Sequence, residues 1–363
     1  MRFRALCPNN SPSPRRAPLA VVALAISALA GCAAEPAAAI PTKPIGAPVL
    51  TLRGVSLSSA EWGSAIPGVF GQDYIYPTHD EVDYFVGKGM TILRIPFLWE
   101  RLQLALNGPL DDAELGRLDD IVNYAAAAGA NVLLDPHNYA AYDGNVIGYG
   151  GVTAAAFADF WGKLADHFKA LPQAYFGLMN EPHSVTGQTL KTADWVAAAN
   201  GAIQAIRATG ATNTIMVSGN GYDTASGWND NWYGTPNAHE LLSIVDPLDK
   251  VVFEAHQYMD SDGSGTHPTC VSATVGSSRL SAFTGWLRSS KKHGFLGEFG
   301  AGTDATCLSA IDDMLKHVEA YDDVYVGWTW WAAGPWWGPY FSSVEPDGGK
   351  DKPQMGVLSN HLQ

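Results

Sequence analysis

The chain has 363 residues, of which 47% are hydrophobic and only 16% are charged. This composition supplies a sizeable buried core and excludes global disorder. The 22 Lys and Arg residues against 36 Asp and Glu residues give a formal net charge of −14. No basic stripe occurs past residue 20, so we expect no nucleic-acid partner. An acidic chain with 12 Trp residues is better suited to a neutral partner.

Residues 1–31 have the pattern of an export signal. They contain four arginines and no acidic residue, and they end in an apolar run from Leu19 to Ala30. That run is shorter than a bilayer span and typical of a signal-peptide core. The sequence Leu29-Ala30-Gly31-Cys32 resembles the lipobox of bacterial lipoproteins, which implies lipidation at Cys32. Ordinary cleavage in the neighbouring Ala-rich stretch is the alternative.

Residues 32–48 are rich in Ala and Pro and carry no periodic apolar pattern, so we expect an extended linker. No second linker of this kind follows, and residues 49–363 are expected to form one domain.

Outside the signal and Cys32, the chain has only Cys270 and Cys307. In an oxidising compartment this pair predicts a disulfide, with two unpaired thiols as the alternative. Without compact Cys/His spacing, we expect no zinc.

Short β-branched and aromatic runs alternate with longer amphipathic stretches along the domain. The expected strands are Leu50–Leu57, Thr91–Phe97, Asn131–Pro136, Tyr175–Met179, Thr214–Ser218, Val251–Ala255, Gly294–Gly297 and Val324–Trp330. The expected helices include Glu114–Ala127, Ala154–Ala170, Thr192–Ala208, Arg279–Lys291 and Leu308–Ala320. This alternation predicts an α/β fold that closes as a (β/α)8 TIM barrel. An open doubly wound sheet is the competing interpretation, but no Gly-x-Gly-x-x-Gly follows the first strand.

Polar and aromatic residues lie in the second expected strand and at the ends of the third to the eighth. In chain order they are Arg94, His137-Asn138-Tyr139, Asn180-Glu181-Pro182, Ser218-Gly219-Asn220, His256-Gln257-Tyr258, Glu298-Phe299-Gly300 and Trp330-Trp331. Because the carboxyl ends of barrel strands carry the active site, we predict a site there.

Two of these residues, Glu181 and Glu298, are carboxylates at the ends of buried apolar strands. A single glutamate is usually just a solvated residue, but burial at a strand end desolvates its carboxylate and perturbs its pKa. Two carboxylates that face one cleft match the machinery of glycoside hydrolysis, in which one protonates the leaving oxygen. The other attacks the anomeric carbon or activates water.

The segments Asn180-Glu181-Pro182 and Gly297-Glu298-Phe299-Gly300 resemble family 5 of the glycoside hydrolases. Further segments are similar to its endo-β-1,4-glucanase (cellulase) branch, and the resemblance spans about residues 50 to 345: Gly89–Phe97, His137–Tyr139, Gly144-Asn145 and Trp330–Gly338. The resemblance implies a retaining (β/α)8 glycoside hydrolase that needs no cofactor and no metal. It makes Glu181 the general acid/base and Glu298 the nucleophile.

The resemblance also implies roles for neighbouring residues. Asn180 would bind the sugar 2-hydroxyl, and Arg94 would lower the pKa of Glu298. The remaining substrate-binding candidates are His137, Asn138, His256, Tyr258 and Trp331. Arg94 could also pair with Asp135, and the two roles are compatible. Strand alternation sends only one of Trp330 and Trp331 into the lumen, and the resemblance selects Trp331.

The sequence does not assign a role to several further tryptophans, and it places several further histidines at the surface. For six tryptophans in expected loops, sugar contact and ordinary packing are both open: Trp62, Trp99, Trp228, Trp232, Trp336 and Trp337. Four histidines are expected at the surface: His167, His239, His293 and His317. The chain departs from the cellulase branch at Tyr222, where a Trp is usual, and in residues 229–240.

The leading hypothesis is therefore an exported, monomeric endo-β-1,4-glucanase acting on a β-glucan, either secreted or held at the cell envelope. Its only contact with a membrane would be the lipid on Cys32. The alternatives are the same chemistry on mannan or xyloglucan, and a carbohydrate-binding barrel without catalysis. The binding barrel is disfavoured because both carboxylates are present. A metal-dependent hydrolase would instead use Asp135, His137 and His256, and activity in EDTA would separate it from a glycosidase.

Overall fold

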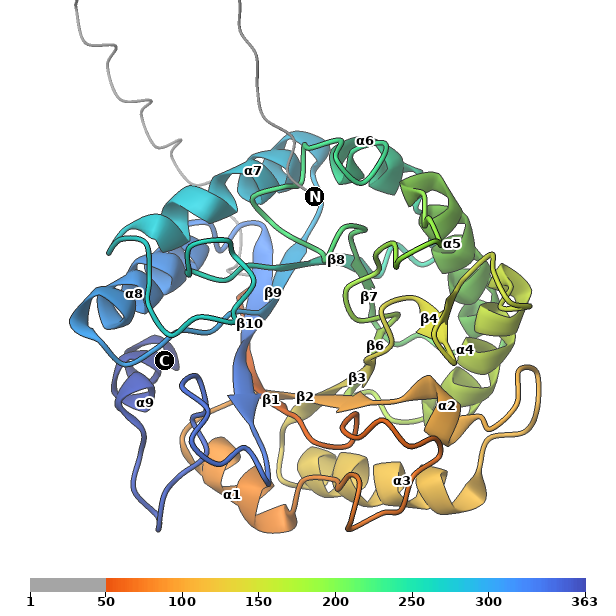
Figure 1. The fold of residues 1–363 in the computed structure, drawn as a ribbon, viewed down its shortest axis with the longest axis horizontal. Helices are drawn as coiled ribbons and strands as arrows, with labels where there is room; N and C mark the ends of the chain where they lie inside the picture. The colour runs from red at the N-terminus through yellow and green to blue at the C-terminus, as the bar shows by residue number, and fades with distance from the viewer. Residues whose placement is uncertain (1–49) are drawn as a thin grey trace, which may run out of the picture. The chain divides into compact units, whose positions relative to one another are not determined.

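The computed structural model describes residues 50–363, so the proposed signal, Cys32 and the linker lie outside the described residues. In the described part, eight parallel strands close into a barrel in the order β1-β10-β9-β8-β7-β6-β3-β2. Figure 1 looks into this barrel, with the helices arranged around the ring of strands. The predicted TIM barrel is thereby confirmed, and an open sheet is excluded.

All eight expected strands are present. They are β1 (Leu52–Leu57), β2 (Ile92–Phe97), β3 (Asn131–Pro136), β6 (Ala174–Gly177), β7 (Ile215–Ser218), β8 (Val251–His256), β9 (Gly294–Glu298) and β10 (Tyr325–Ala333). A two-stranded hairpin of β4 (Ala141–Tyr142) and β5 (Asn145–Val146) was not predicted. Its strands are too short to show a pattern. Asp143 and Gly144, with φ of 48° and 69°, make its turn, as two-residue hairpins require.

Helices separate most consecutive barrel strands. They are α1 (His79–Gly87), α2 (Trp99–Leu102), α3 (Asp112–Ala127), α4 (Ala154–Phe168), α5 (Thr192–Ala208), α6 (Asn237–Glu240), α7 (Val275–Ser290), α8 (Ala305–Ala320) and α9 (Pro353–Leu358). The five expected helices are among them. Between β7 and β8 only α6 and one 3₁₀ turn, Leu241–Ser243, replace a full helix. None of the described helices is long and apolar enough to cross a bilayer.

The barrel lumen is layered along its axis. At the amino ends of the strands, an apolar cluster fills it: Leu52, Ile92, Leu133, Met216, Val252 and Phe295. Because side chains alternate along a strand, the next inward residues are two positions further on. On β2, β3 and β8 these are Arg94, Asp135 and Glu254, all buried. A charged layer therefore lies directly above the apolar plug, toward the carboxyl ends.

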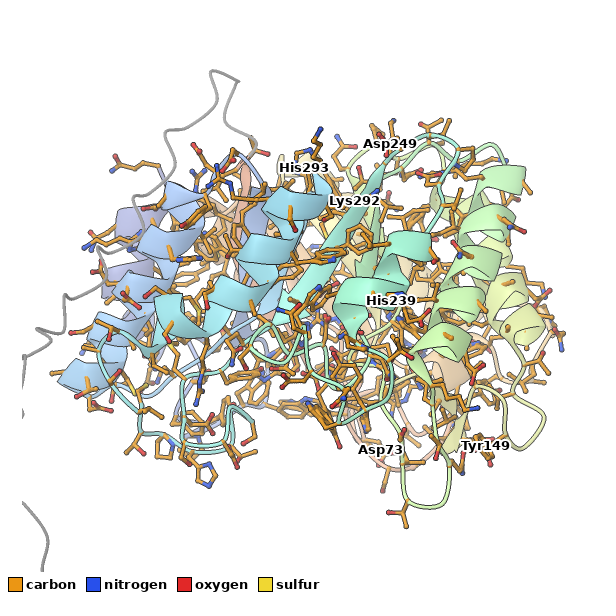
Figure 2. All side chains as sticks on the ribbon, turned by 90° about the horizontal axis from the view of Figure 1, so that it is seen from above. Asp73, Tyr149, His239, Asp249, Lys292 and His293 are labelled. Carbon is orange, nitrogen blue, oxygen red and sulfur yellow. A yellow bond between two sulfur atoms is a disulfide. The ribbon has the colours of Figure 1, made fainter. Side chains whose placement is uncertain are left out.

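The two ends of the barrel differ in what they carry. Figure 2 shows Asp249, Lys292 and His293, which precede β8 and β9, at one end of the molecule. Asp73 and Tyr149, from loops that follow β1 and β5, lie at the opposite end. The loops after the strands, and hence the predicted site, are at this second end.

The predicted disulfide between Cys270 and Cys307 is present. It joins the loop after β8 to the first turn of α8, with the two Cα atoms 5.1 Å apart. Cys307 therefore lies in a helix rather than in the loop after β9.

The structure decides between packing and sugar contact for two tryptophans, and it corrects the expectation for one histidine. Trp99 begins α2 and Trp228 follows β7, and both indoles are fully buried in the core against aromatic neighbours. They are packing residues and are closed to sugar. His317 is only half-exposed, because its Nε2 lies 2.8 Å from the buried Thr284 hydroxyl. His167, His239 and His293 are exposed, as expected.

Candidate active site

The two predicted carboxylates meet at the carboxyl end of the barrel. Glu298 is the last residue of β9, whereas Glu181 lies four residues beyond the end of β6. Glu181 has a φ of 38°, a strained backbone conformation that is found most often at functional sites. One oxygen of each carboxylate and a ring nitrogen of His256 all lie within 4.8 Å of one another. Such closeness is typical of retaining glycosidases, at about 5–5.5 Å, rather than inverting ones, at about 6.5–9.5 Å.

The surroundings of Glu298 keep it ionised. Its Oε1 accepts a 2.6 Å hydrogen bond from Arg94 Nη1, and its Oε2 accepts a 2.7 Å bond from the Tyr258 hydroxyl. Burial alone would raise the pKa of Glu298, but the positive charges of His256 and Arg94 outweigh it and lower that pKa to about 2. Arg94 thus lies where the resemblance places it, beside Glu298. Burial and the Glu298 carboxylate also raise the pKa of Tyr258, so its hydroxyl remains a donor.

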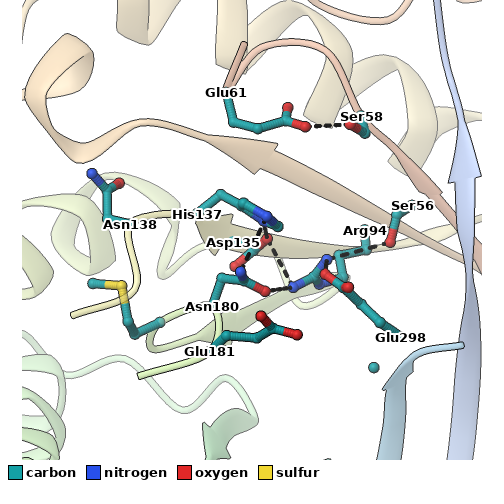
Figure 3. A network of polar contacts seen from close by, with 12 residues as sticks. Ser56, Ser58, Glu61, Arg94, Asp135, His137, Asn138, Asn180, Glu181 and Glu298 are labelled. Carbon is teal, nitrogen blue, oxygen red and sulfur yellow. Dashed lines mark hydrogen bonds and ion pairs between the residues drawn. The ribbon is translucent and has the colours of Figure 1, made fainter. Parts of the chain in front are cut away.

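Arg94 also fixes the orientation of Asn180 (Figure 3). Its Nη2 lies 3.0 Å from Asp135 and donates a 2.7 Å hydrogen bond to Asn180 Oδ1. The Asn180 amide nitrogen is therefore turned to His137 Nε2, 3.1 Å away. On its other side, His137 Nδ1 lies 2.8 Å from Asp135. This chain confirms the anticipated Arg94–Asp135 pair and leaves the second amide hydrogen of Asn180 for a ligand.

His256 lies between carboxylates on both sides of its ring. Nδ1 is 2.9 Å from Glu181, and Nε2 is 3.2 Å from Glu254. Burial lowers the pKa of His256, but the carboxylates of Glu298, Glu181 and Glu254 raise it well above its usual value. Sequence reasoning did not identify Glu254, although its place two residues before His256 on one strand was a usable signal.

Asn138 lies at the cleft beside His137 and Trp331, but its side chain is held by hydrogen bonds within the protein. Its Oδ1 accepts a 2.7 Å hydrogen bond from the Trp99 backbone, and its amide nitrogen donates to Glu100. Figure 3 shows it turned away from Arg94 and Glu298. These contacts hold the loop after β3, and contact of Asn138 with substrate stays a prediction.

Trp331 faces the site and Trp330 does not. The Trp331 ring stacks on His137 at 5.2 Å between centroids and lies 5.8 Å from the Arg94 guanidinium carbon. Trp330 is fully buried and donates from its indole to the Ser342 carbonyl. Strand alternation allowed only one of the two to face the lumen, and the choice of Trp331 from the resemblance is consistent with this geometry.

Two adjoining cavities form the cleft, and Tyr139 and His183 line both. The first holds about 630 Å³, and its lining includes Glu181, Tyr222, Trp232, His256 and Tyr258. The second holds about 520 Å³, and its lining includes Glu61, Trp62, His137 and Trp331. A cleft that extends to both sides of the carboxylates can accept a chain rather than a single sugar.

Aromatic rings line the first cavity in a row. Tyr222 stacks on His183 at 4.0 Å, and Trp232 stacks on Tyr222 at 6.3 Å, with interplanar angles of 21° and 20°. Tyr222 and Trp232, which belong to the departures noted in the sequence, thus line one side of the cleft. In the second cavity, Trp62 packs edge-on against Trp337, which in turn contacts Trp331.

The metal alternative fits this arrangement poorly. Asp135 and His137 bind each other, and Asp135 also pairs with Arg94. His256 is held separately by Glu181 and Glu254. In the described part of the chain the three residues do not converge on a common point, and an arginine already fills the space beside Asp135.

A family model described as "Cellulase (glycosyl hydrolase family 5)" matches residues 42–334. The chain belongs to this family. An endo-beta-1,4-glucanase B of Aspergillus niger is 39% identical over 314 residues, which is 85% of this chain and 89% of the relative. Among solved structures, an endo-beta-1,4-glucanase of Xanthomonas axonopodis pv. citri is 48% identical with a TM-score of 0.84, covering 86% of this chain and 99% of that one.

A second structure shows a family member with ligand. The enzyme XacCel5A was solved in complex with cellopentaose; it is 47% identical, with a TM-score of 0.83, and the match covers 86% of this chain and 99% of that one. Family membership agrees with the paired carboxylates and the barrel described above, and it makes the chain a glycoside hydrolase by fold and site.

Proposed function

We propose that this family 5 enzyme is an endo-β-1,4-glucanase that cleaves internal β-1,4-glucosidic bonds of cellulose-type glucans. The observation that carries the proposal is an ionised Glu298 whose carboxylate lies within 4.8 Å of that of Glu181 at the floor of a long cleft. Relatives that the chain matches over most of its length are named endo-β-1,4-glucanases, and one binds cellopentaose, which supports this substrate class.

The chemistry follows from the positions of the two carboxylates. Glu298 attacks the anomeric carbon and forms a covalent glycosyl-enzyme, while Glu181 gives its proton to the leaving oxygen. Water then enters, Glu181 takes its proton, and the hydroxide displaces Glu298 with net retention of configuration. Arg94 and Tyr258 hold both oxygens of Glu298, so its orientation is set before substrate binds.

The neighbours of the pair position the sugar. Asn180 has one amide hydrogen left to donate to the sugar 2-hydroxyl, a bond that strengthens in the transition state. Trp331 offers an indole face beside His137 for the apolar face of the ring. Tyr222 and Trp232 extend this aromatic surface along the cleft. A neutral glucan suits a cleft in which aromatic rings outnumber cations.

We also propose that the chain is exported. The support is the sequence of residues 1–32, with its arginines, apolar run and lipobox-like end. Lipidation of Cys32 with residues 32–48 as a linker would hold the barrel, as a monomer, near the cell envelope; signal cleavage without lipidation would release it. Labelling of the expressed protein with palmitate distinguishes these two outcomes, since only the lipoprotein incorporates label.

The substrate is tested by measuring carboxymethyl-cellulose, mannan and xyloglucan side by side, with products sized by chromatography and Glu298→Ala as the inactive control. We expect a rapid drop in the viscosity of the cellulose derivative and cello-oligosaccharide products. Faster cleavage of mannan or xyloglucan would refute the assignment. The absence of cleavage of all three would favour a binding barrel instead.

A further inference from the structure

Glu254 is a buried carboxylate that the mechanism above leaves unused. It lies on β8, two residues before His256, in the charged layer of the lumen, and its side chain is 5% exposed. Its Oε1 is 3.2 Å from His256 Nε2 and 3.7 Å from Arg94 Nε. Glu254 is one same-face step deeper along β8 than His256, so it lies below the substrate rather than beside it.

We propose that Glu254 is a positioning residue that keeps the proton on His256 Nε2, and thereby holds a positive charge beside Glu181 and Glu298 throughout turnover. The proposal rests on the roles given to Glu181 and Glu298 above. Glu254 acts through His256 and does not touch the reacting atoms.

The two nitrogens of His256 face different partners. Nδ1 is 2.9 Å from Glu181 and 3.6 Å from Glu298, so its hydrogen points to the catalytic pair. Nε2 faces Glu254 at 3.2 Å and Asp223 at 3.9 Å. A neutral imidazole has only one N–H, and would turn a lone pair toward a carboxylate on one side. With a carboxylate on each side, the doubly protonated ring can donate a hydrogen bond to both.

The other acid near Nε2 does not supply this charge. Asp223 lies in the loop after β7, is fully buried, and accepts the backbone N–H of Gly219 through Oδ1. Its Oδ2 has no hydrogen-bond partner among the described residues. Burial raises the pKa of Asp223 well above its ordinary value, which disfavours its ionised form, and its Oδ2 is 3.9 Å from Nε2 against 3.2 Å for Glu254. Glu254 is left as the counter-ion of His256 on the side away from the substrate.

The neighbouring strand makes room for Glu254. Gly297 is the residue before Glu298 on β9, and a Cβ atom there would lie 1.9 Å from Glu254 Oε1. Any side chain at Gly297 would therefore displace the carboxylate. The glycine beside the nucleophile thus serves the contact between Glu254 and His256.

The positive charge bears on both steps of the reaction. Glu298 must be ionised before it attacks, and Glu181 becomes ionised when it has given up its proton. The imidazolium lies close to both carboxylates and stabilises each anion in turn. His256 itself transfers no proton; it remains charged because Glu254 faces its other nitrogen.

The test is a measurement of the His256 ring nitrogens in the ¹⁵N-histidine-labelled full chain. NMR between about pH 5 and about pH 8 reports whether one or both nitrogens carry hydrogen. A His256→Asn variant assigns the signal. We expect both nitrogens to be protonated across this range in the wild type. In Glu254→Gln, which keeps the size and an acceptor but not the charge, we expect His256 to titrate within the range.

Kinetics supply the second readout. In Glu254→Gln, kcat/KM for an aryl β-cellobioside should gain an inflection at the midpoint of the His256 titration and fall about tenfold above it. Glu254→Asp keeps the charge and should keep His256 protonated. Glu81→Gln, a change at a buried carboxylate that caps α1, is the matched control and should alter neither readout.

Three results would overturn the proposal. They are a neutral His256 in the wild type, a His256 that stays doubly protonated in Glu254→Gln, and a loss of activity in Glu254→Gln without any change in the ring nitrogens. The first is measured on the wild type and does not depend on whether a variant folds. Since the NMR readout needs no substrate, its failure is distinct from failure of the glucanase assignment.

Discussion

At the scale of single residues, the site is a buried network in which positive and negative side chains alternate. Arg94 contacts Glu298, Asp135 and Asn180, while His256 contacts Glu181 and Glu254. Each charged group that loses water on burial gains an opposite charge or a hydrogen bond. Removing one member leaves its neighbours unpaired, so substitutions here should affect catalysis more than their distance from the sugar suggests.

Arg94→Met tests this pairing. The loss of the guanidinium removes a positive charge that lowers the pKa of Glu298, so that pKa rises. Since the nucleophile must be ionised, the acidic limb of the pH profile of kcat/KM should move to higher pH, and activity should fall by roughly 10²–10³-fold. Arg117→Met, on the outer helix α3, is the control. An unmoved acidic limb in Arg94→Met would contradict this account.

Aromatic residues of the cleft make a second prediction. Tyr222→Ala and Trp232→Ala each remove a ring from the stacked row in the first cavity. Such contacts are worth about 0.5–1.5 kcal/mol, so KM for long cello-oligosaccharides should rise by roughly 2- to 12-fold.

The control for this prediction is Trp336→Ala. Trp336 is 47% exposed and is not among the described residues that line the cleft. Its loss should leave KM unchanged, and so should the loss of Tyr222 or Trp232 when the substrate is a short aryl glycoside. An equal effect of all three variants would show that the row does not bind sugar.

At the scale of the elements, the loops and short elements that follow β3, β6 and β7 carry the features that sequence patterns describe least well. The barrel strands were predictable because each is a buried run of apolar residues between polar turns. The β4–β5 hairpin and α6 are too short for a period to show. Glu181 was placed at a strand end, yet β6 stops at Gly177 and a non-repetitive segment delivers Glu181 to the site.

The disulfide joins the loop after β8 to the first turn of α8, and it gives a third prediction. Cys270 and Cys307 are separated by 37 residues, and in the chain-entropy model a closed loop of this length stabilises the fold by roughly 3–4 kcal/mol. Cys270→Ser with Cys307→Ser should lower the free energy of unfolding in urea by about that amount. Alkylation of the non-reduced wild type should modify neither cysteine, and two modified thiols would refute the bond.

At the scale of the whole molecule, the sequence indicated the barrel, the catalytic pair, Arg94, Asn180, His256, Tyr258 and Trp331, because each lies on or just after a recognisable strand. It could not place residues whose role depends on neighbours far along the chain. Asn138 turns to Glu100, and Trp99 and Trp228 fill the core instead of the cleft. The close approach of Glu254 to Gly297 is visible only once β8 and β9 are side by side.

Core packing holds this architecture together, and Trp228 tests it. The indole is fully buried against Phe283 and Trp286 on α7. Trp228→Ala should lower the free energy of unfolding by about 3–5 kcal/mol, measured by denaturant titration. A change under about 1 kcal/mol would show that Trp228 is not a core residue.

The central claim is that Glu298 is the nucleophile and Glu181 the acid/base of a retaining pair, and azide rescue tests it most directly. In Glu298→Ala, azide can occupy the vacated space and attack an activated β-glycoside once, which should give the α-glycosyl azide. In Glu181→Ala, a substrate with a good leaving group should still glycosylate Glu298, and azide should then release the β-glycosyl azide. Azides of opposite configuration from the two variants are the predicted result; reversed configurations, or near-normal hydrolysis by Glu298→Ala, would contradict the claim.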